Sequence, residues 1–178
     1  MHLRLSLMVL ATAALQLGTQ GPAFDEYQVK AAFLYNFAKF VEWPPRTFAN
    51  ATDPFGICII GQNPFGSTLE DMVQGKKIGA RGFAVWQLRD TQQAGKCQIL
   101  FIGAAASKRN PASLEALKSA NILTVGETED FTATGGIIGF KLEGTRVRIR
   151  IALDSAERTR LRISSKLLGV AEIVKRQP

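Results

Sequence analysis

The chain has 178 residues, 46% of them hydrophobic and 21% charged, which is enough apolar content for one domain with a substantial core. Its 22 Lys and Arg residues outnumber 15 Asp and Glu residues and give a net charge of +7. The single histidine, His2, lies in a predicted leader, so the exported protein would lack the commonest general base and metal ligand at neutral pH. This composition favours a binding or regulatory protein over an enzyme, and no cofactor is expected.

Residues 1–23 have the pattern of a secretion signal. Arg4 places a positive charge ahead of an apolar run at residues 5–15, and small residues follow. This run is too short to span a bilayer about 30 Å thick, which argues against a membrane anchor. We therefore predict export, with cleavage near Ala23, and one domain over residues 24–178.

Loss of the leader removes Arg4 and lowers the net charge to +6. In an exported protein, this excess of positive charge indicates acidic protein partners or anionic surfaces rather than nucleic acid. A solvated basic surface without a partner is the alternative interpretation.

The first predicted helix begins at Asp25, which forms a capping-box pattern with Gln28. It runs to about Val41, where Trp43 and two prolines end it. Apolar residues surround this helix instead of forming one stripe, which is typical of a helix buried on more than one side. Either the helix is enclosed within its own domain, or one face is left for a second subunit or a partner.

The middle of the chain alternates buried strands with short helices. Strands are predicted at residues 55–61, 83–88, 97–102 and 122–125, helices at 65–73 and 111–119, a basic loop or short strand at 76–82, and a helical turn at 127–131.

The end of the chain contains an antiparallel pattern. Residues 137–142 and 146–153 are predicted to form a hairpin at the sheet edge, and residues 164–174 an amphipathic helix. The elements together predict an α/β fold: a single-domain mixed-sheet sandwich with helices on both faces and an antiparallel edge hairpin.

Arginines alternate with apolar residues in the second hairpin strand. Because successive side chains of a strand point to opposite faces, Arg146, Arg148 and Arg150 share one face. This row either keeps an edge strand from pairing or forms a basic surface for an acidic partner.

Two cysteines, Cys58 and Cys97, lie at predicted buried strands. An even number of cysteines in an exported protein favours a disulfide, and two cysteines without histidine cannot complete a zinc site unless carboxylates join them. Neighbouring parallel strands lie close enough for the bond. We therefore predict a disulfide and no metal site.

Three motifs that resemble catalytic or ligand-binding patterns are weak. The glycine-bearing loop at residues 61–66 lacks both nucleotide-binding spacings. The acids at residues 127–130 lack a calcium-loop pattern and suit the first turn of a helix. Ser165 and Lys166 are adjacent on a predicted helix and point apart. No catalytic residue is therefore predicted.

Four stretches of the chain together resemble the YfiR family of periplasmic proteins. They are residues 27–44 (YQVKAAFLYNFAKFVEWP), 57–61 (ICIIG) with 64–66 (PFG), 122–127 (ILTVGE) with Phe131, and 163–168 (ISSKLL). The first and last stretches are the most specific, and the match spans nearly the whole exported chain.

The resemblance implies a periplasmic protein that binds and represses the periplasmic part of an inner-membrane diguanylate cyclase, which lowers cyclic di-GMP. It further implies a homodimer, an outer-membrane lipoprotein that sequesters the repressor, and a strand-linking disulfide between Cys58 and Cys97. A second cysteine pair found in some members is missing here, so redox control that depends on that pair is not carried over.

The chain departs from the family where Phe-Glu-Ile-Asn is usual, because residues 149–152 read Ile-Arg-Ile-Ala. A carboxylate is replaced by a guanidinium, so a partner that meets this strand is expected to differ in charge.

We expect two partner-facing patches, with Lys39, Glu42 and Trp43 at the end of the first helix and Arg148 and Arg150 in the hairpin. The rival interpretation is a periplasmic sensor that holds a small ligand at the carboxyl ends of the parallel strands, near Gly61 and Gly103. The two interpretations differ in where the functional residues lie.

Overall fold

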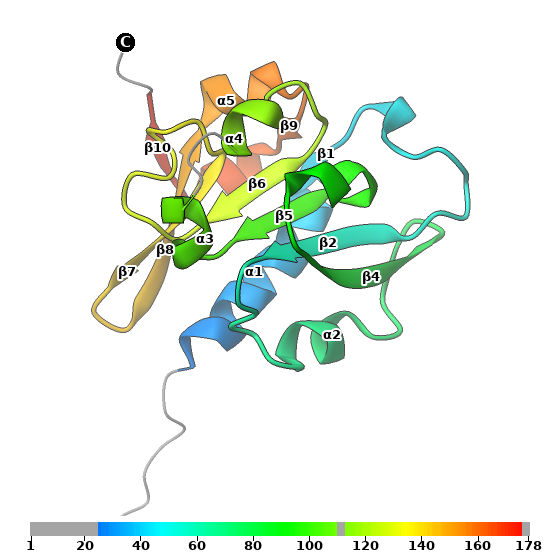
Figure 1. Ribbon diagram of the computed structural model, residues 1–178, viewed down its shortest axis with the longest axis horizontal. Coiled ribbons are helices and arrows are strands. Elements are labelled where there is room, and N and C mark those ends of the chain that lie inside the picture. Colours follow the sequence, from blue (N-terminus) through cyan, green and yellow to red (C-terminus); the bar gives the residue numbers. More distant parts are fainter. Residues whose placement is uncertain (1–24, 110–112, 176–178) are drawn as a thin grey trace, which may run out of the picture.

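The computed structural model describes residues 25–109 and 113–175 (Figure 1). The predicted leader, its cleavage site at Ala23 and the helix start predicted at Pro111 lie outside the described residues.

The first helix, α1 (Glu26–Phe40), begins and ends where the sequence predicts. The Asp25 carboxylate accepts hydrogen bonds from the backbone N–H groups of Tyr27 and Gln28, each at 3.1 Å, and so caps the helix. At Val41 the chain becomes extended and forms β1 (Val41–Glu42), which pairs antiparallel with β9 (Arg162–Ile163).

The main sheet has eight strands, and its central strands are parallel. In spatial order they are β10 (Glu172–Val174), β8 (Arg146–Ala152), β7 (Ile138–Glu143), β6 (Leu123–Gly126), β5 (Ile99–Ile102), β2 (Phe55–Ile60), β4 (Arg81–Leu88) and β3 (Lys77–Ile78). Only the β7–β8 hairpin and the short β3–β4 pair are antiparallel, and β10 joins β8 in parallel.

Helices cover both faces of this sheet, which confirms the predicted fold class. The larger core cluster packs α1, α2 (Thr68–Val73), α5 (Leu153–Arg158) and α6 (Ser165–Leu168) against one face. The smaller cluster packs η2 (Thr91–Lys96), α3 (Ala104–Arg109) and α4 (Ser113–Ala116) against the other. In Figure 1, α1 runs behind the sheet, whereas α3 and α4 lie in front of it.

The predicted helix over residues 164–174 is wrong beyond its first turn. Helix α6 ends at Leu168, and after Gly169 the chain becomes β10, with Glu172 opposite Arg150 in β8. Strand β10 therefore covers the end of β8, while residues 146–149 of β8 remain at the sheet edge. A β-branched pair of residues, Ile173 and Val174, gains backbone hydrogen bonds by extending the sheet, which outweighs the weak helical pattern of this segment.

Two other short elements differ from the prediction. The alanine-rich segment 104–109 forms the unpredicted helix α3, and in place of the helical turn predicted at 127–131 the structure has hydrogen-bonded turns over residues 129–135. The helix predicted over residues 111–119 is described only as α4.

Phe131 is fully buried between two glycines, and these turns depend on that packing. A Cβ atom at Gly126 or Gly136 would overlap the Phe131 ring. We expect Gly126→Ala to lower the free energy of unfolding by about 1–3 kcal/mol, measured by urea unfolding, because the ring has no room to move. Gly95→Ala, where nothing lies within 4 Å of the new methyl group, is the matched control. Equal unfolding midpoints for the two variants would contradict this packing argument.

Candidate functional site

The hairpin presents the arginine row on one face, as the alternating sequence predicts. Val147, Ile149 and Ile151 are buried in the core cluster that contains α1. The intervening arginines therefore point to the opposite face, and Arg148 has 53% of its side chain exposed.

The arginines differ in how many contacts they make within the chain. Arg148 Nε lies 3.5 Å from a carboxylate oxygen of Glu143, and Lys141 Nζ lies 2.7 Å from the other oxygen. The hydrogen bond from Lys141 and its charge, with a smaller effect of Arg148, hold the pKa of Glu143 below its ordinary value. Arg148 is thus only loosely paired, and its charged guanidinium group stays exposed at the surface.

Arg150 mainly joins parts of the fold. Its Nε donates to the Glu172 carboxylate at 3.3 Å, and its Nη1 donates to the carbonyl of Glu129 at 3.2 Å. These bonds tie the hairpin to β10 and to the turn that follows β6, and they leave the Arg150 side chain only 20% exposed. Of the two hairpin arginines expected to face a partner, Arg148 is the more accessible.

The second expected patch lies at the end of α1. Lys39 and Glu42 are exposed, and Lys39 Nζ lies 4.0 Å from the centre of the Tyr35 ring. Trp43 is partly buried instead: its indole N–H donates to the carbonyl of Gln98 at 3.2 Å, and its ring packs edge-on against Phe55. Trp43 therefore attaches the helix end to the sheet.

The two patches lie on opposite faces of the sheet. Helix α1 and Trp43 pack with the larger core cluster, whereas the hairpin arginines point away from that cluster. A compact partner would contact one patch or the other, and a partner that contacts both has to reach around the sheet edge.

A buried ionic cluster is the main feature that the sequence did not predict. Lys30 is 4% exposed, and its ammonium group pairs with Glu26 and, at 2.6 Å, with Glu127. The other carboxylate oxygen of Glu127 accepts the backbone N–H of Ala104 at 3.3 Å, and the Tyr27 hydroxyl donates to Glu127 at 3.4 Å. The cluster joins α1 to the segments that follow β5 and β6.

This environment changes the acidity of two groups. Burial by itself would lower the pKa of Lys30, but hydrogen bonds and charge from Glu127 and Glu26 outweigh burial and raise it above its ordinary value. Burial, together with the nearby Glu127 charge, raises the pKa of Tyr27. A lysine among apolar residues of the first helix was the available signal for a buried acidic partner.

Cys58 and Cys97 are joined by a disulfide, as the sequence predicts, with their Cα atoms 5.8 Å apart. Both residues are buried in the smaller core cluster, where Cys58 lies within β2 and Cys97 directly follows η2. The bond therefore attaches the η2 crossover to β2, one of the inner parallel strands of the sheet.

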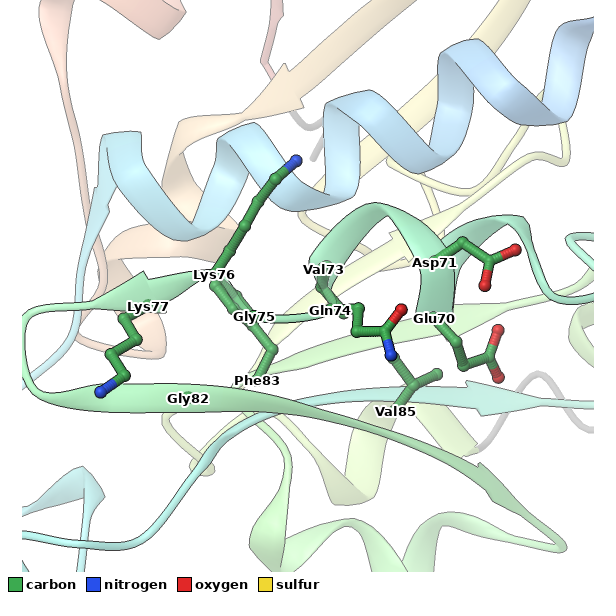
Figure 2. Close-up of a pocket in the computed structure, with 10 residues that line it drawn as sticks. All are labelled: Glu70, Asp71, Val73, Gln74, Gly75, Lys76, Lys77, Gly82, Phe83 and Val85. Atoms are coloured by element: carbon green, nitrogen blue, oxygen red, sulfur yellow. The ribbon is translucent and has the colours of Figure 1, made fainter.

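A groove of about 430 Å³ lies between α2 and β4 (Figure 2). Phe83 and Val85 of β4 form its apolar floor, while Lys77 lies at one end and Glu70 at the other. The charges at its rim are of opposite sign and lie apart from one another, so the groove does not gather groups of one chemical kind.

Neither metal binding nor membrane spanning finds support within residues 25–109 and 113–175. No group of three or more His, Cys, Asp or Glu side chains is placed to hold a metal ion in these ranges. In the same part of the chain, no helix is both long and apolar enough to cross a bilayer.

Comparisons with known proteins identify a family. The comparison with curated proteins returns no match. Among solved structures, an ABC domain in complex with L-Trp from Streptococcus pneumonia is similar at 9% identity and a TM-score of 0.49; the alignment covers 67% of this chain, which spans 55% of that one. The model of the YfiR/HmsC-like family matches residues 27–172. The chain therefore belongs to the YfiR/HmsC-like family, whose members are periplasmic regulators of cyclic di-GMP signalling and not enzymes.

Proposed function

We propose that this protein represses an inner-membrane diguanylate cyclase by binding its periplasmic part, without catalysing a reaction. The match to the YfiR/HmsC-like family over residues 27–172 is the observation that supports this function most strongly. We further propose that the leader is cleaved near Ala23, that residues 24–178 act as one domain and as a homodimer, and that an outer-membrane lipoprotein sequesters the repressor.

The surface chemistry fits a protein partner. Arg148 presents a charged group on a hairpin strand whose other face is packed into the core, so the strand that carries the exposed side chain is held in place. An exposed cation increases the rate and specificity of encounter with an acidic partner more than it increases affinity. Lys39 and Glu42 form the second proposed contact, at the end of α1.

Deleting the gene tests the function directly. We expect cellular cyclic di-GMP to rise in the deletion strain, because the cyclase is no longer repressed. The full chain should restore the low level, whereas a chain that begins at residue 24 and stays in the cytoplasm should not. The cyclase whose own deletion abolishes the rise is then the partner. An unchanged cyclic di-GMP level in the deletion strain would exclude the proposed repression.

The hairpin contact has its own test with that partner. We expect Arg148→Glu to weaken binding to the periplasmic part of the cyclase about tenfold and to reduce the salt dependence of binding, measured by calorimetry at two ionic strengths. Arg89→Glu makes the same charge change in the loop after β4, near the opposite edge of the sheet, and should leave binding unchanged. If the two variants bind alike, the hairpin is not the contact surface.

A further inference from the structure

The topology of the sheet creates a crevice at the carboxyl ends of β2 and β5. These neighbouring strands are parallel, but the chain leaves β2 for α2 on one face and leaves β5 for α3 on the other. In open α/β sheets, the point where the connections diverge in this way is where ligands bind.

A cavity of about 630 Å³ lies at this crevice. Its apolar wall is formed by four side chains that are buried in the smaller core cluster: Ile60, Leu88, Ile102 and Ala106. Gly61 leaves β2 with a positive φ of 96°, and a Cβ atom there would come within 3.0 Å of Ala106 Cβ. The glycine therefore lets the two segments approach each other closely.

Two guanidinium groups border the same cavity. Arg89 comes from the loop after β4 and Arg109 from the end of α3, and both residues are exposed. Within the described ranges, neither has a carboxylate within 4 Å. Two cations from separate segments thus line one cavity, and neither forms an ion pair within the described part of the chain.

Two other polar side chains that line the cavity form hydrogen bonds within the chain. The Gln87 side-chain amide donates to the carbonyl of Gly61 at 2.8 Å. The Asp90 carboxylate accepts the backbone N–H of Gln92 at 2.9 Å and caps η2. The two guanidinium groups are the cationic groups that border the cavity, and guanidinium groups bind carboxylate and phosphate oxygens in pairs.

We propose that this cavity binds a small organic anion, a carboxylate or phosphate that carries an apolar group. The apolar group packs against Ile60, Leu88 and Ile102, and the anionic group lies between Arg89 and Arg109. Burial of the apolar part supplies affinity, and the two arginines select the charge. The test of this site uses the isolated protein, so its outcome does not depend on whether the protein represses a cyclase.

Calorimetric titration of the whole purified protein tests the site with four probes. Benzoate and phenyl phosphate combine a ring with an anionic group, whereas benzyl alcohol lacks the charge and inorganic phosphate lacks the ring. We expect both aromatic anions to bind at least tenfold more tightly than benzyl alcohol or inorganic phosphate. Equal affinity for benzoate and benzyl alcohol, or no binding of either aromatic anion, would overturn the proposal.

Variants locate the binding to this cavity. The double variant Arg89→Gln/Arg109→Gln should weaken binding of benzoate at least tenfold, and Arg146→Gln/Arg148→Gln, which removes the same charge from the hairpin, should leave it unchanged. An unchanged thermal unfolding midpoint shows that each double variant is folded. Amide chemical shifts that move at residues 60–61, 88–91 and 102–109 on benzoate addition support the site, and shifts confined to other segments contradict it.

Discussion

Replacing Lys30 by methionine is expected to lower the free energy of unfolding by about 3–5 kcal/mol, because it leaves the mostly buried Glu127 carboxylate, whose side chain is 13% exposed, without its cation. Urea unfolding followed by circular dichroism measures the loss. Lys39→Met is the matched control, since Lys39 lies on the same helix but is exposed, and it should change stability by less than about 0.5 kcal/mol. Similar losses in the two variants would show that the cluster contributes little.

The pH dependence of stability provides a second readout of the same cluster. The pKa of Lys30 is raised in the folded protein, so its contribution is complete below the ordinary lysine pKa of about 10.5 and is lost as pH rises through the folded value. The raised pKa of Tyr27 acts in the same direction above about pH 10. We therefore expect wild-type stability to fall steeply with rising alkaline pH, and Lys30→Met to show a shallower decline. Parallel curves would contradict this assignment.

Removing the disulfide with Cys58→Ala/Cys97→Ala is expected to cost about 4 kcal/mol of unfolding free energy. The two residues are 39 positions apart, and the bond restricts the unfolded chain by closing a loop of this length. The measurement is urea unfolding with and without reductant. Reduced wild-type protein should unfold at nearly the same urea concentration as the variant, and reductant should not affect the variant. A loss below about 1 kcal/mol would mean that the bond is energetically unimportant.

Local sequence signals predicted much of the fold. The Asp25 cap and the prolines after Trp43 set the ends of α1, and the continuous apolar run at Phe55–Ile60 became a strand buried on both faces. The predicted placement of the β8 arginines on one face is also found in the structure. Successive side chains of a strand alternate between faces, so burial of the apolar residues places the arginines on the opposite face.

Features that depend on the order of the strands could not be predicted from local sequence signals. Lys30 and Glu127 are separated by 97 residues, and they meet only because β5 and β6 end beside the start of α1. The position of β10 beside β8 similarly depends on which edge of the sheet is free. The contact between Arg150 and Glu172 could not be predicted for the same reason, because Glu172 lies beside Arg150 only when β10 pairs with β8.

The hydrogen bond from the Trp43 indole to the Gln98 carbonyl has a consequence for recognition at the end of α1. The carbonyl of Gln98 also accepts the backbone N–H of Leu123, so the indole is anchored where three separate segments converge. Lys39 and Glu42 therefore project from a helix end that is anchored to the sheet. Binding of a partner to these residues costs little entropy, because this surface is already ordered. Selection between partners at this end of the molecule should then depend on how well their shapes fit. A well-fitting partner should dissociate slowly, and the surface should not rearrange to accommodate a poorly fitting one.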